Sequence, residues 1–429
     1  MLSTTYENVD ETIYTEVLDN GLTVCLLPRQ GLSKTYGIFT TAFGATDMTF
    51  VPIGQSKKTT VPLGVAHFLE HKMFDKGDHD AFADFSKLGS AANAYTNSTE
   101  TAYLFSATEK VKENVELLLD FVQDPYFTEE TVEKEKGIIT QEAQMYADNP
   151  DQRLYMSTLE ALFEHHPVRY EVLGTLESIN NITKDDLYTC YHTFYHPSNM
   201  TLCIAGQMDV EEMMDFIRAN QNEKEFAPAD DIQRFTPEEP KAVYESKKTI
   251  SMPVSTPKCM VGIKEYSETI SEDELRNRTL LTSMMLSYFF GSSGPFYKEL
   301  YDEGIIDFSF GAETLSEQDY GYSLLSSNAQ DPEMFAQRVK SLLLSTKTYQ
   351  LDEVSFERMK KRKIGSLLRG MNSIENVAEN IIWHNNRGLD YFKLIPAIEA
   401  LTLEEANNFL DSWIEEDRIS IVTMLPEQD

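Results

Sequence analysis

The order of apolar and polar positions predicts that the chain begins with β-strands. Alternation in "YTEVLDNGLTVCLLPRQ" predicts a strand, a turn at Asn20-Gly21 and a second strand over residues 22–27. The segment "KTYGIFTTAFGATDMTF" continues with the same strand-like alternation. The N-terminal region is therefore expected to be mostly strand.

Helical spacing of apolar residues begins at residues 64–74, which read "GVAHFLEHKMF". A short amphipathic helix that ends at Gly89, two strands rich in Thr and Tyr, and helices over residues 109–121 and 129–146 follow. A further helix leads past Pro197 into the apolar strand "MTLCIAG". Strands and helices are thus interspersed along this part of the chain.

The pattern changes between about Arg218 and Lys248, where the sequence is polar, highly charged and interrupted by prolines. Such a composition is typical of a linker between domains. We therefore predict a domain over residues 1–220, a linker over residues 221–245 and a second domain over residues 246–429.

The two predicted domains share a layout. The segment "MMLSYFFGSSGPFYKELYDEG" mirrors "AHFLEHKMFDKGDHDAFADFSKLG", because each reads as an apolar helix followed by a short amphipathic helix closed by glycine. Each domain also ends in an apolar, strand-like run, "MTLCIAG" and "RISIVTML". We therefore expect a duplicated domain.

Composition places the chain among soluble globular proteins of two or three domains. Of its 429 residues, 41% are hydrophobic and 25% charged, and no apolar run approaches the roughly 20 residues that span a bilayer. The first residues show no basic segment and no apolar segment of a secretory signal. The four cysteines are far apart and form no CxxC pair, which argues against a disulfide framework and against a cysteine zinc site. We expect a cytoplasmic protein that does not associate with membranes.

The chain is strongly acidic, with 70 acidic and 37 basic residues and a formal net charge of -33. A surface this negative repels phosphate backbones, so nucleic-acid binding is not expected. The charge would attract cationic peptides, although the simpler interpretation is that it keeps the protein soluble.

Candidate chemistry lies in the helix predicted over residues 64–74. His67 and His71 are four residues apart and Glu70 is three after His67, so all three project from one side of a helix. Two imidazoles one turn apart can bind one Zn²⁺, and a neighbouring glutamate can take a proton from water that zinc has made acidic. Surface residues on an amphipathic helix would be the alternative, but this spacing is the H-x-x-E-H pattern of inverzincins.

Catalytic zinc normally has three protein ligands and one water. Along the helix predicted over residues 129–146, Glu135 and Glu142 fall within an apolar stripe that includes Val132 and Ile139. Burying a carboxylate is costly unless a cation or a hydrogen-bond donor compensates. Both glutamates are therefore candidates for the third ligand, and the spacing does not distinguish between them.

The chain resembles the pitrilysin/insulinase family of zinc metallopeptidases, in its branch of shorter, two-domain members. Beyond "HFLEH", the segments "GSAANAYTNSTETAY", "EKEKGIITQE", "HPVRYEVLGTLESINNIT" and "YHPSNMTLCIAGQMD" are similar to family landmarks. The resemblance implies an α+β fold of two similar halves, each an antiparallel sheet with helices packed on one face, arranged as a clamshell. It also implies a zinc-dependent endopeptidase that hydrolyses peptides or small unfolded proteins.

The resemblance assigns roles by position. His67, His71 and Glu142 are implied as the zinc ligands. Glu70 and Glu135 are implied as catalytic residues, Glu70 as the general base and Glu135 in support of the ligands. Asn93 and Ala94 are implied to lie on an edge strand that pairs with a peptide substrate, for which an ordinary edge strand is the alternative interpretation.

The second half departs from the family pattern. Near the place that corresponds to the histidine cluster it has Ser283 and Ser287, with neither His nor Glu. Family members commonly carry a substrate-holding Arg and Tyr in this half, whereas Tyr301 and Phe308 stand at about those positions here. Neither side chain offers a guanidinium or a phenol at the required place. The chain thus resembles a metal-bearing subunit, and we expect a homo- or hetero-dimer with a homologous metal-less subunit that supplies those groups.

Two other functions stay open at this point. The chain can be a catalytically inactive peptide-binding or scaffold subunit, as some members of the family are. It can also be a metal-dependent hydrolase of a non-peptide amide. Bound zinc would distinguish an enzyme from a scaffold.

Overall fold

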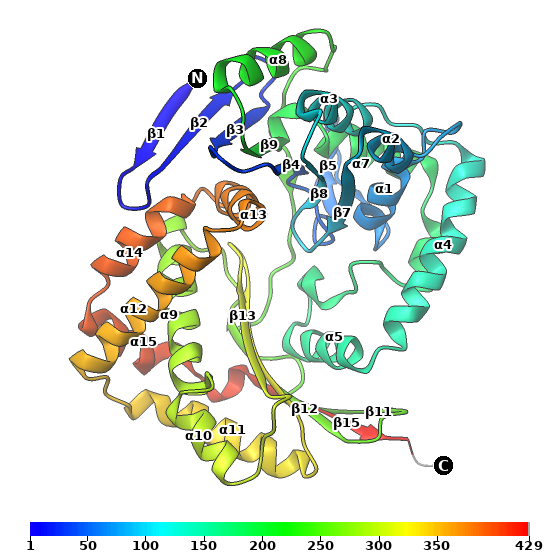
Figure 1. Ribbon diagram of the computed structural model, residues 1–429. Coiled ribbons are helices and arrows are strands. Elements are labelled where there is room, and N and C mark those ends of the chain that lie inside the picture. Colours follow the sequence, from blue (N-terminus) through cyan, green and yellow to red (C-terminus); the bar gives the residue numbers. More distant parts are fainter. Residues whose placement is uncertain (428–429) are drawn as a thin grey trace.

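The computed structural model describes residues 1–427, and its two halves lie side by side (Figure 1). The elements of the first half are β1 (Leu2–Tyr6), β2 (Glu11–Val17), β3 (Thr23–Pro28), β4 (Thr35–Thr41), β5 (Thr49–Val51), β6 (Thr59–Thr60), α1 (Val65–Phe74), α2 (Ala81–Leu88), β7 (Ala91–Thr96), β8 (Thr101–Ala107), α3 (Val111–Val122), α4 (Glu129–Ala147), α5 (Pro150–Leu162), α6 (Leu176–Asn181), α7 (Lys184–Phe194), β9 (Met200–Gly206) and α8 (Val210–Asn222). Short β10 (Gln233–Arg234) follows. The elements of the second half are β11 (Lys247–Met252), β12 (Lys258–Tyr266), α9 (Glu272–Phe290), α10 (Pro295–Asp302), β13 (Gly311–Ser316), β14 (Gly321–Asn328), α11 (Pro332–Ser345), α12 (Glu353–Gly370), α13 (Ile374–Asn385), α14 (Leu394–Ala400), α15 (Leu403–Trp413) and β15 (Ile419–Pro426).

Each half is built on one large sheet, and the two sheets have the same topology. The first has the strand order β1-β2-β3-β9-β4-β8-β7 and the second has the order β11-β15-β12-β14-β13. Without β1 and β2, the strands correspond one to one in chain order. In each sheet one pair is parallel, β3 with β9 and β11 with β15, and the other pairs are antiparallel. The predicted α+β fold of two similar halves is confirmed.

Alternate side chains of the first sheet belong to different hydrophobic clusters. Val24, Phe39 and Leu202 pack with α1, α3 and α7 of their own half. On the opposite face, Cys25 and Ile38 pack with α13 of the second half. This alternation follows from the two-residue repeat of a strand, which sends successive side chains to opposite faces.

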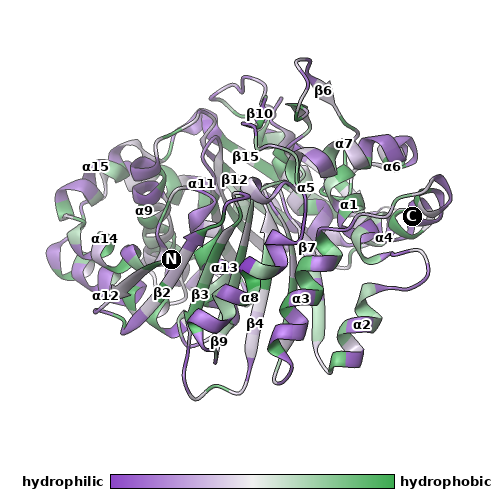
Figure 2. Cartoon of the chain, turned by 90° about the horizontal axis from the view of Figure 1, so that it is seen from above, coloured by the Kyte–Doolittle hydropathy of each residue, from purple (hydrophilic) through white to green (hydrophobic). Residues whose placement is uncertain are grey.

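A helix of the first half likewise packs against the second sheet. Helix α5 packs against β12 and β15, where Leu159 and Leu162 contact a cluster that contains Met260, Val422 and Met424. Helices α9 and α11 lie with the other face in the largest cluster. One face of each sheet therefore packs against helices of its own half, and the other face packs against a helix of the other half. We call these two helices, α5 and α13, the exchanged helices. In Figure 2 helices such as α8 and α12 show both purple and green residues, as expected of helices with one exposed and one buried face.

The segment predicted as a linker is attached to both halves. Strand β10 pairs with β5 of the first half. Glu239 accepts hydrogen bonds from the Lys264 ammonium at 2.6 Å and from the backbone N–H of Glu164 at 2.9 Å. Helix α5 packs against the second sheet and helix α13 against the first, so each half contacts the other over a wide area. The domain boundaries at residues 220 and 246 stay a prediction.

All four cysteines are buried, and none forms a disulfide in the described part of the chain. Among the helices formed by residues 1–427, none is both long and apolar enough to cross a membrane.

Candidate metal centre

Helix α1 is buried along nearly its whole length, with only His71 partly accessible. The N-cap of the helix is Gly64, whose φ of +86° is left-handed and where a Cβ would lie 2.2 Å from the carbonyl oxygen of Leu173. At the other end, the fully buried Lys72 donates to Asp75 Oδ2 at 2.6 Å. Gly64 thus lets the start of α1 lie against the backbone at Leu173, and the Lys72–Asp75 pair closes the C-terminal end of the same helix.

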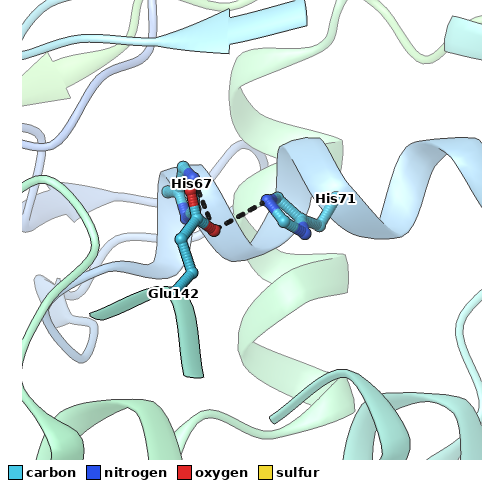
Figure 3. A group of neighbouring side chains, drawn as sticks. All are labelled: His67, His71 and Glu142. Carbon is cyan, nitrogen blue, oxygen red and sulfur yellow. Dashed lines mark ion pairs between the residues drawn. The ribbon is translucent and has the colours of Figure 1, made fainter. Parts of the chain in front are cut away.

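His67, His71 and Glu142 converge from α1 and α4 (Figure 3). Glu142 Oε2 lies 3.8 Å from His67 Nε2 and 3.4 Å from His71 Nε2. One ligand atom of each residue lies within 4.8 Å of the ligand atoms of the other two. The structure therefore brings together the three residues that the sequence resemblance implies as metal ligands.

Glu135 stands two turns before Glu142 on the same face of α4, beside buried Val132 and Ile139. Its Oε1 lies 3.0 Å from His71 Nδ1. This contact assigns the proton to Nδ1 and leaves Nε2 free to face Glu142. Glu135 thus contacts a candidate ligand from behind and does not join the group of ligand atoms.

Glu70 is buried on the same side of α1 and is held by β7. Thr96 Oγ1 donates to Glu70 Oε2 at 2.6 Å, and the Oε1 atom accepts no hydrogen bond from residues 1–427. Sequence reasoning did not single out Thr96, although it belongs to the segment "NAYT" of the family landmark. A short polar side chain at the end of an edge strand was the signal that could have identified it.

The electrostatics around α1 favour a cation between the two imidazoles. Burial lowers the pKa of His67 to about 3, and the neighbouring His71 acts in the same direction, so His67 is neutral at pH 7. Burial alone would lower the pKa of His71, but the hydrogen bond to Glu135 and the nearby carboxylates raise it. Burial raises the pKa of Glu70, against the opposing effects of Thr96 and His71. A neutral imidazole beside carboxylates is the state that binds a metal.

The donor set fits a zinc ion. Four atoms arranged tetrahedrally at about 2.0–2.1 Å from Zn²⁺ lie roughly 3.4 Å from one another. The separations of Glu142 Oε2 from the two Nε2 atoms, 3.4 and 3.8 Å, are close to this value. Two imidazoles and one carboxylate are also a common ligand set of hydrolytic zinc sites, which keep the fourth position for water. His67 Nδ1 is buried without a hydrogen-bond partner among residues 1–427, so only His71 has the supporting carboxylate.

A cavity of about 870 Å³ adjoins the three candidate ligands. All of its lining residues lie between residues 67 and 173, so the described part of the second half does not contribute to it. Asn93 and Ala94 line the cavity from β7, which is the edge strand of the first sheet. The structure thus places both predicted substrate-binding residues beside the candidate metal site. Helix α5, which sequence analysis did not predict, supplies further lining residues such as Tyr155 and Met156.

Tyr301 and Phe308 of the second half lie outside this cavity. Tyr301 is 57% exposed and Phe308 is 94% exposed. These two residues stand at about the positions where family members commonly carry a substrate-holding Arg and Tyr. In the single chain both positions therefore face solvent.

Two family models match the chain. The one described as Insulinase (Peptidase family M16) matches residues 46–176 and contains every candidate site residue. The one described as Peptidase M16 inactive domain matches residues 181–363. The match to an inactive domain agrees with the absence of His and Glu at the corresponding place in the second half.

Individual relatives match over nearly the whole chain. The zinc protease YmfH of Bacillus subtilis (strain 168) is 43% identical over 422 residues, which cover 98% of each chain. The solved structure of an M16-like peptidase from Alicyclobacillus acidocaldarius has a TM-score of 0.93 and 38% identity, and the match covers 97% of this chain and 99% of that one. Pitrilysin shares the fold with a TM-score of 0.76 at 16% identity, and the match covers 99% of this chain but 46% of pitrilysin. In fold, one copy of this chain therefore corresponds to about half of pitrilysin.

Proposed function

The chain belongs to the insulinase family, peptidase family M16, and from this premise we propose that it is a zinc-dependent endopeptidase acting on peptides or small unfolded proteins. The observation that carries the proposal is the convergence of His67, His71 and Glu142 beside a large cavity. These three residues are the proposed zinc ligands. When bound, zinc would supply Lewis-acid chemistry: it would polarise the carbonyl and lower the pKa of water, so that the water loses a proton readily and can attack that carbonyl.

Glu70 is the proposed general base. Thr96 occupies its Oε2 atom, which leaves Oε1 to accept a proton from the attacking water. The same oxygen can then donate this proton to the leaving amine. The buried position of Glu70 supports such a role, because burial raises its pKa and makes protonation easier during the reaction.

The edge strand β7 is the proposed binding site for the peptide backbone. It pairs with β8 on one side, and its other side is the free edge of the sheet. An extended peptide can add to such an edge through backbone hydrogen bonds. Asn93 is exposed on this strand and Ala94 beside it is partly buried, so both lie next to an added peptide.

We expect full activity to need a homologous metal-less subunit in a homo- or hetero-dimer. The cavity is lined by the first half alone, and no Arg or Tyr of the second half reaches it. The correspondence to half of pitrilysin is consistent with a second unit of the same fold. The test is to compare kcat/KM of the purified chain before and after adding a homologous protein that co-purifies with it. A value unchanged by any such partner would contradict this part of the proposal.

The central test measures zinc content and peptide cleavage by the full-length protein. We expect about one zinc per chain by elemental analysis and cleavage of a fluorogenic unstructured peptide. Glu70→Gln should keep zinc and lower kcat by about 10²–10⁴-fold, because it removes the general base. Glu142→Ala should lose zinc and activity together, because it removes one of three ligands.

Glu133→Gln is the matched control, since it replaces a carboxylate by an amide, as Glu70→Gln does, but at an exposed position of α4. It should leave both zinc and activity unchanged. Normal turnover by Glu70→Gln would refute the assigned base, and a protein without stoichiometric zinc would refute the metal site. Zinc binding without peptide cleavage, alone or with a partner, would favour the inactive-subunit or non-peptide alternatives.

A further inference from the structure

A cavity whose charged lining residues are all cationic occupies the place in the second half that corresponds to the candidate metal centre. The strand order and element order are the same in both halves, so α9 corresponds to α1 and α12 to α4. His67 and His71 stand seven and three residues before Phe74, the last residue of α1. At the same distances before Phe290, the last residue of α9, stand Ser283 and Ser287.

The glutamates of α4 have also been replaced. Glu135 and Glu142 stand seven and fourteen residues after the N-cap of α4. The residues at the same distances from the N-cap of α12 are Met359 and Ser366. Serine hydroxyls and a thioether do not form a zinc site. The second half has therefore lost the capacity for metal at this place.

The replaced residues line a cavity of about 460 Å³ between α9 and α12. In Figure 1 these two helices lie on the opposite side of the molecule from α4. No acidic side chain lines the cavity in the described structure, and its charged lining residues are all cationic: Arg358, Arg362, Lys363 and Arg369. Hydroxyl groups and positive charges thus stand where the first half has imidazoles and carboxylates.

These four cations lack carboxylate partners, which is unexpected in a chain with 70 acidic residues. Within residues 1–427, none of the four forms an ion pair. Arg338 on the adjacent α11 shows the contrasting case, since it binds both Glu299 and Glu303. A set of unpaired cations around one cavity is a local positive field on an otherwise negative protein.

Lys363 carries the strongest indication of an anion. Its ammonium donates to Ser283 Oγ at 2.8 Å, and burial lowers its pKa. The residue is half-buried, and holding an ammonium group partly out of water is costly unless an opposite charge compensates; a single hydroxyl does not supply that charge. An anion in the cavity would.

Arg362 is also oriented toward this cavity by its neighbours. Its Nη1 donates to the carbonyl oxygen of Ser287 at 3.1 Å, which leaves the other guanidinium N–H groups for a ligand. A Cβ at Gly291 would lie 3.0 Å from Arg362 Nη2, so the guanidinium rests against bare backbone. The N-terminus of α10 adds to the field, because Pro295 lines the cavity and the first turn contains no acidic residue.

We propose that this cavity binds a small phosphate-bearing anion. Guanidinium groups and hydroxyls match the several oxygens of a phosphate, which can accept bidentate hydrogen bonds from arginine. Four cations exceed the charge of one carboxylate, and the volume suits a small molecule. The overall charge of -33 disfavours a nucleic-acid strand as the ligand. This site does not depend on the proposed peptidase function.

Titration calorimetry of the full-length protein with sodium pyrophosphate at low ionic strength tests the proposal. We expect saturable binding of one pyrophosphate per chain. Arg362→Gln should weaken it by at least about tenfold, because one charge-assisted contact is lost. Lys363→Met, which keeps the length of the side chain, should weaken it similarly while the zinc content stays the same.

Lys361→Gln is the matched control, because this exposed residue lies on the same helix, carries the same charge and does not line the cavity. It should change the dissociation constant by less than about twofold. Equal weakening by Lys361→Gln would show general charge attraction and overturn the site. Absence of saturable pyrophosphate binding would overturn it as well, and equally tight binding of citrate would overturn the assignment to phosphate.

Discussion

At the scale of single residues, the candidate metal centre depends on side chains that do not bind metal. Glu135 contacts His71 Nδ1 from behind, and Thr96 holds one oxygen of Glu70. Contacts of this kind fix which nitrogen of an imidazole faces a metal and raise its basicity. The candidate site therefore includes more residues than its three proposed ligands.

Glu135→Gln should weaken zinc binding without abolishing it. The amide oxygen can still accept a hydrogen bond from His71, but the negative charge that strengthens this ligand is lost. We expect the zinc dissociation constant to rise by about 10–100-fold, measured by competition with a chromophoric chelator. Glu133→Gln on the same helix should leave it unchanged. An unaltered constant in Glu135→Gln would show that the contact is incidental.

Glu265 is a buried carboxyl group outside the site. It lies on β12, where Trp413 Nε1 donates to its Oε2 at 3.1 Å, and burial raises its pKa from 4.5 to about 7. A carboxyl with a raised pKa in the folded state stabilises the fold most at low pH, and this stability is lost as pH rises through about 7. Wild type should therefore lose stability between pH 5 and pH 8.

Glu265→Gln should remove part of that pH dependence, since glutamine stays neutral. We expect the difference in unfolding free energy between pH 5 and pH 8 to shrink by ~2 kcal/mol, measured by urea denaturation at both pH values. The exposed Glu268→Gln is the control and should leave the difference as in wild type. A Glu265→Gln protein with the wild-type pH dependence would contradict the raised pKa.

At the scale of elements, the exchanged helices α5 and α13 join the halves. The contact between α5 and β12 is close because β12 has a glycine there. A Cβ at Gly262 would lie 2.6 Å from Thr158 Cγ2 and 3.1 Å from Leu162 Cδ1. The absence of a side chain at Gly262 thus sets how closely α5 approaches the second sheet.

Gly262→Ala should force α5 away from β12 and destabilise the protein by about 1–3 kcal/mol, the usual cost of overpacking. Thermal unfolding monitored by circular dichroism would measure the fall in Tm. Gly311→Ala is the control on edge strand β13, where nothing lies within 4 Å of the added methyl group. A wild-type Tm for Gly262→Ala would mean that the contact is loose.

At the scale of the whole molecule, the two halves are coupled by more than the exchanged helices. Arg387 of the second half donates to Thr99 Oγ1 at 3.0 Å, and Asn386 donates to Glu100 Oε2 at 3.0 Å. Tyr36 of the first sheet donates to Glu379 on α13 at 2.8 Å. If either half unfolds, the exchanged helix leaves an apolar sheet face of the other half exposed to water.

The full-length chain should therefore unfold in a single transition. Differential scanning calorimetry should show one peak whose calorimetric and van't Hoff enthalpies agree, because neither half retains a complete core without the other. Two resolved peaks would contradict the coupling. The dimer with a metal-less subunit and the cytoplasmic location stay predictions at this scale.

The sequence by itself determined the features that depend on local spacing. His67, Glu70 and His71 share one side of α1 because a helix places residues three and four apart together, and the duplication was visible in the repeated order of helices and strands. The apolar stripe of α4 predicted that Glu135 and Glu142 point inward, but the stripe did not say which one binds a metal, and the family resemblance supplied that assignment.

Only the tertiary structure decided which side chains of different helices meet and which sheet each helix packs against. The angle between α1 and α4 places Glu142 near both Nε2 atoms and Glu135 behind His71, and no periodicity contains that angle. The exchange of α5 and α13 and the cationic cavity between α9 and α12 are likewise absent from the pattern. An apolar stripe shows that a helix must be buried, but the sheet that buries it is chosen by contacts between residues far apart in the chain.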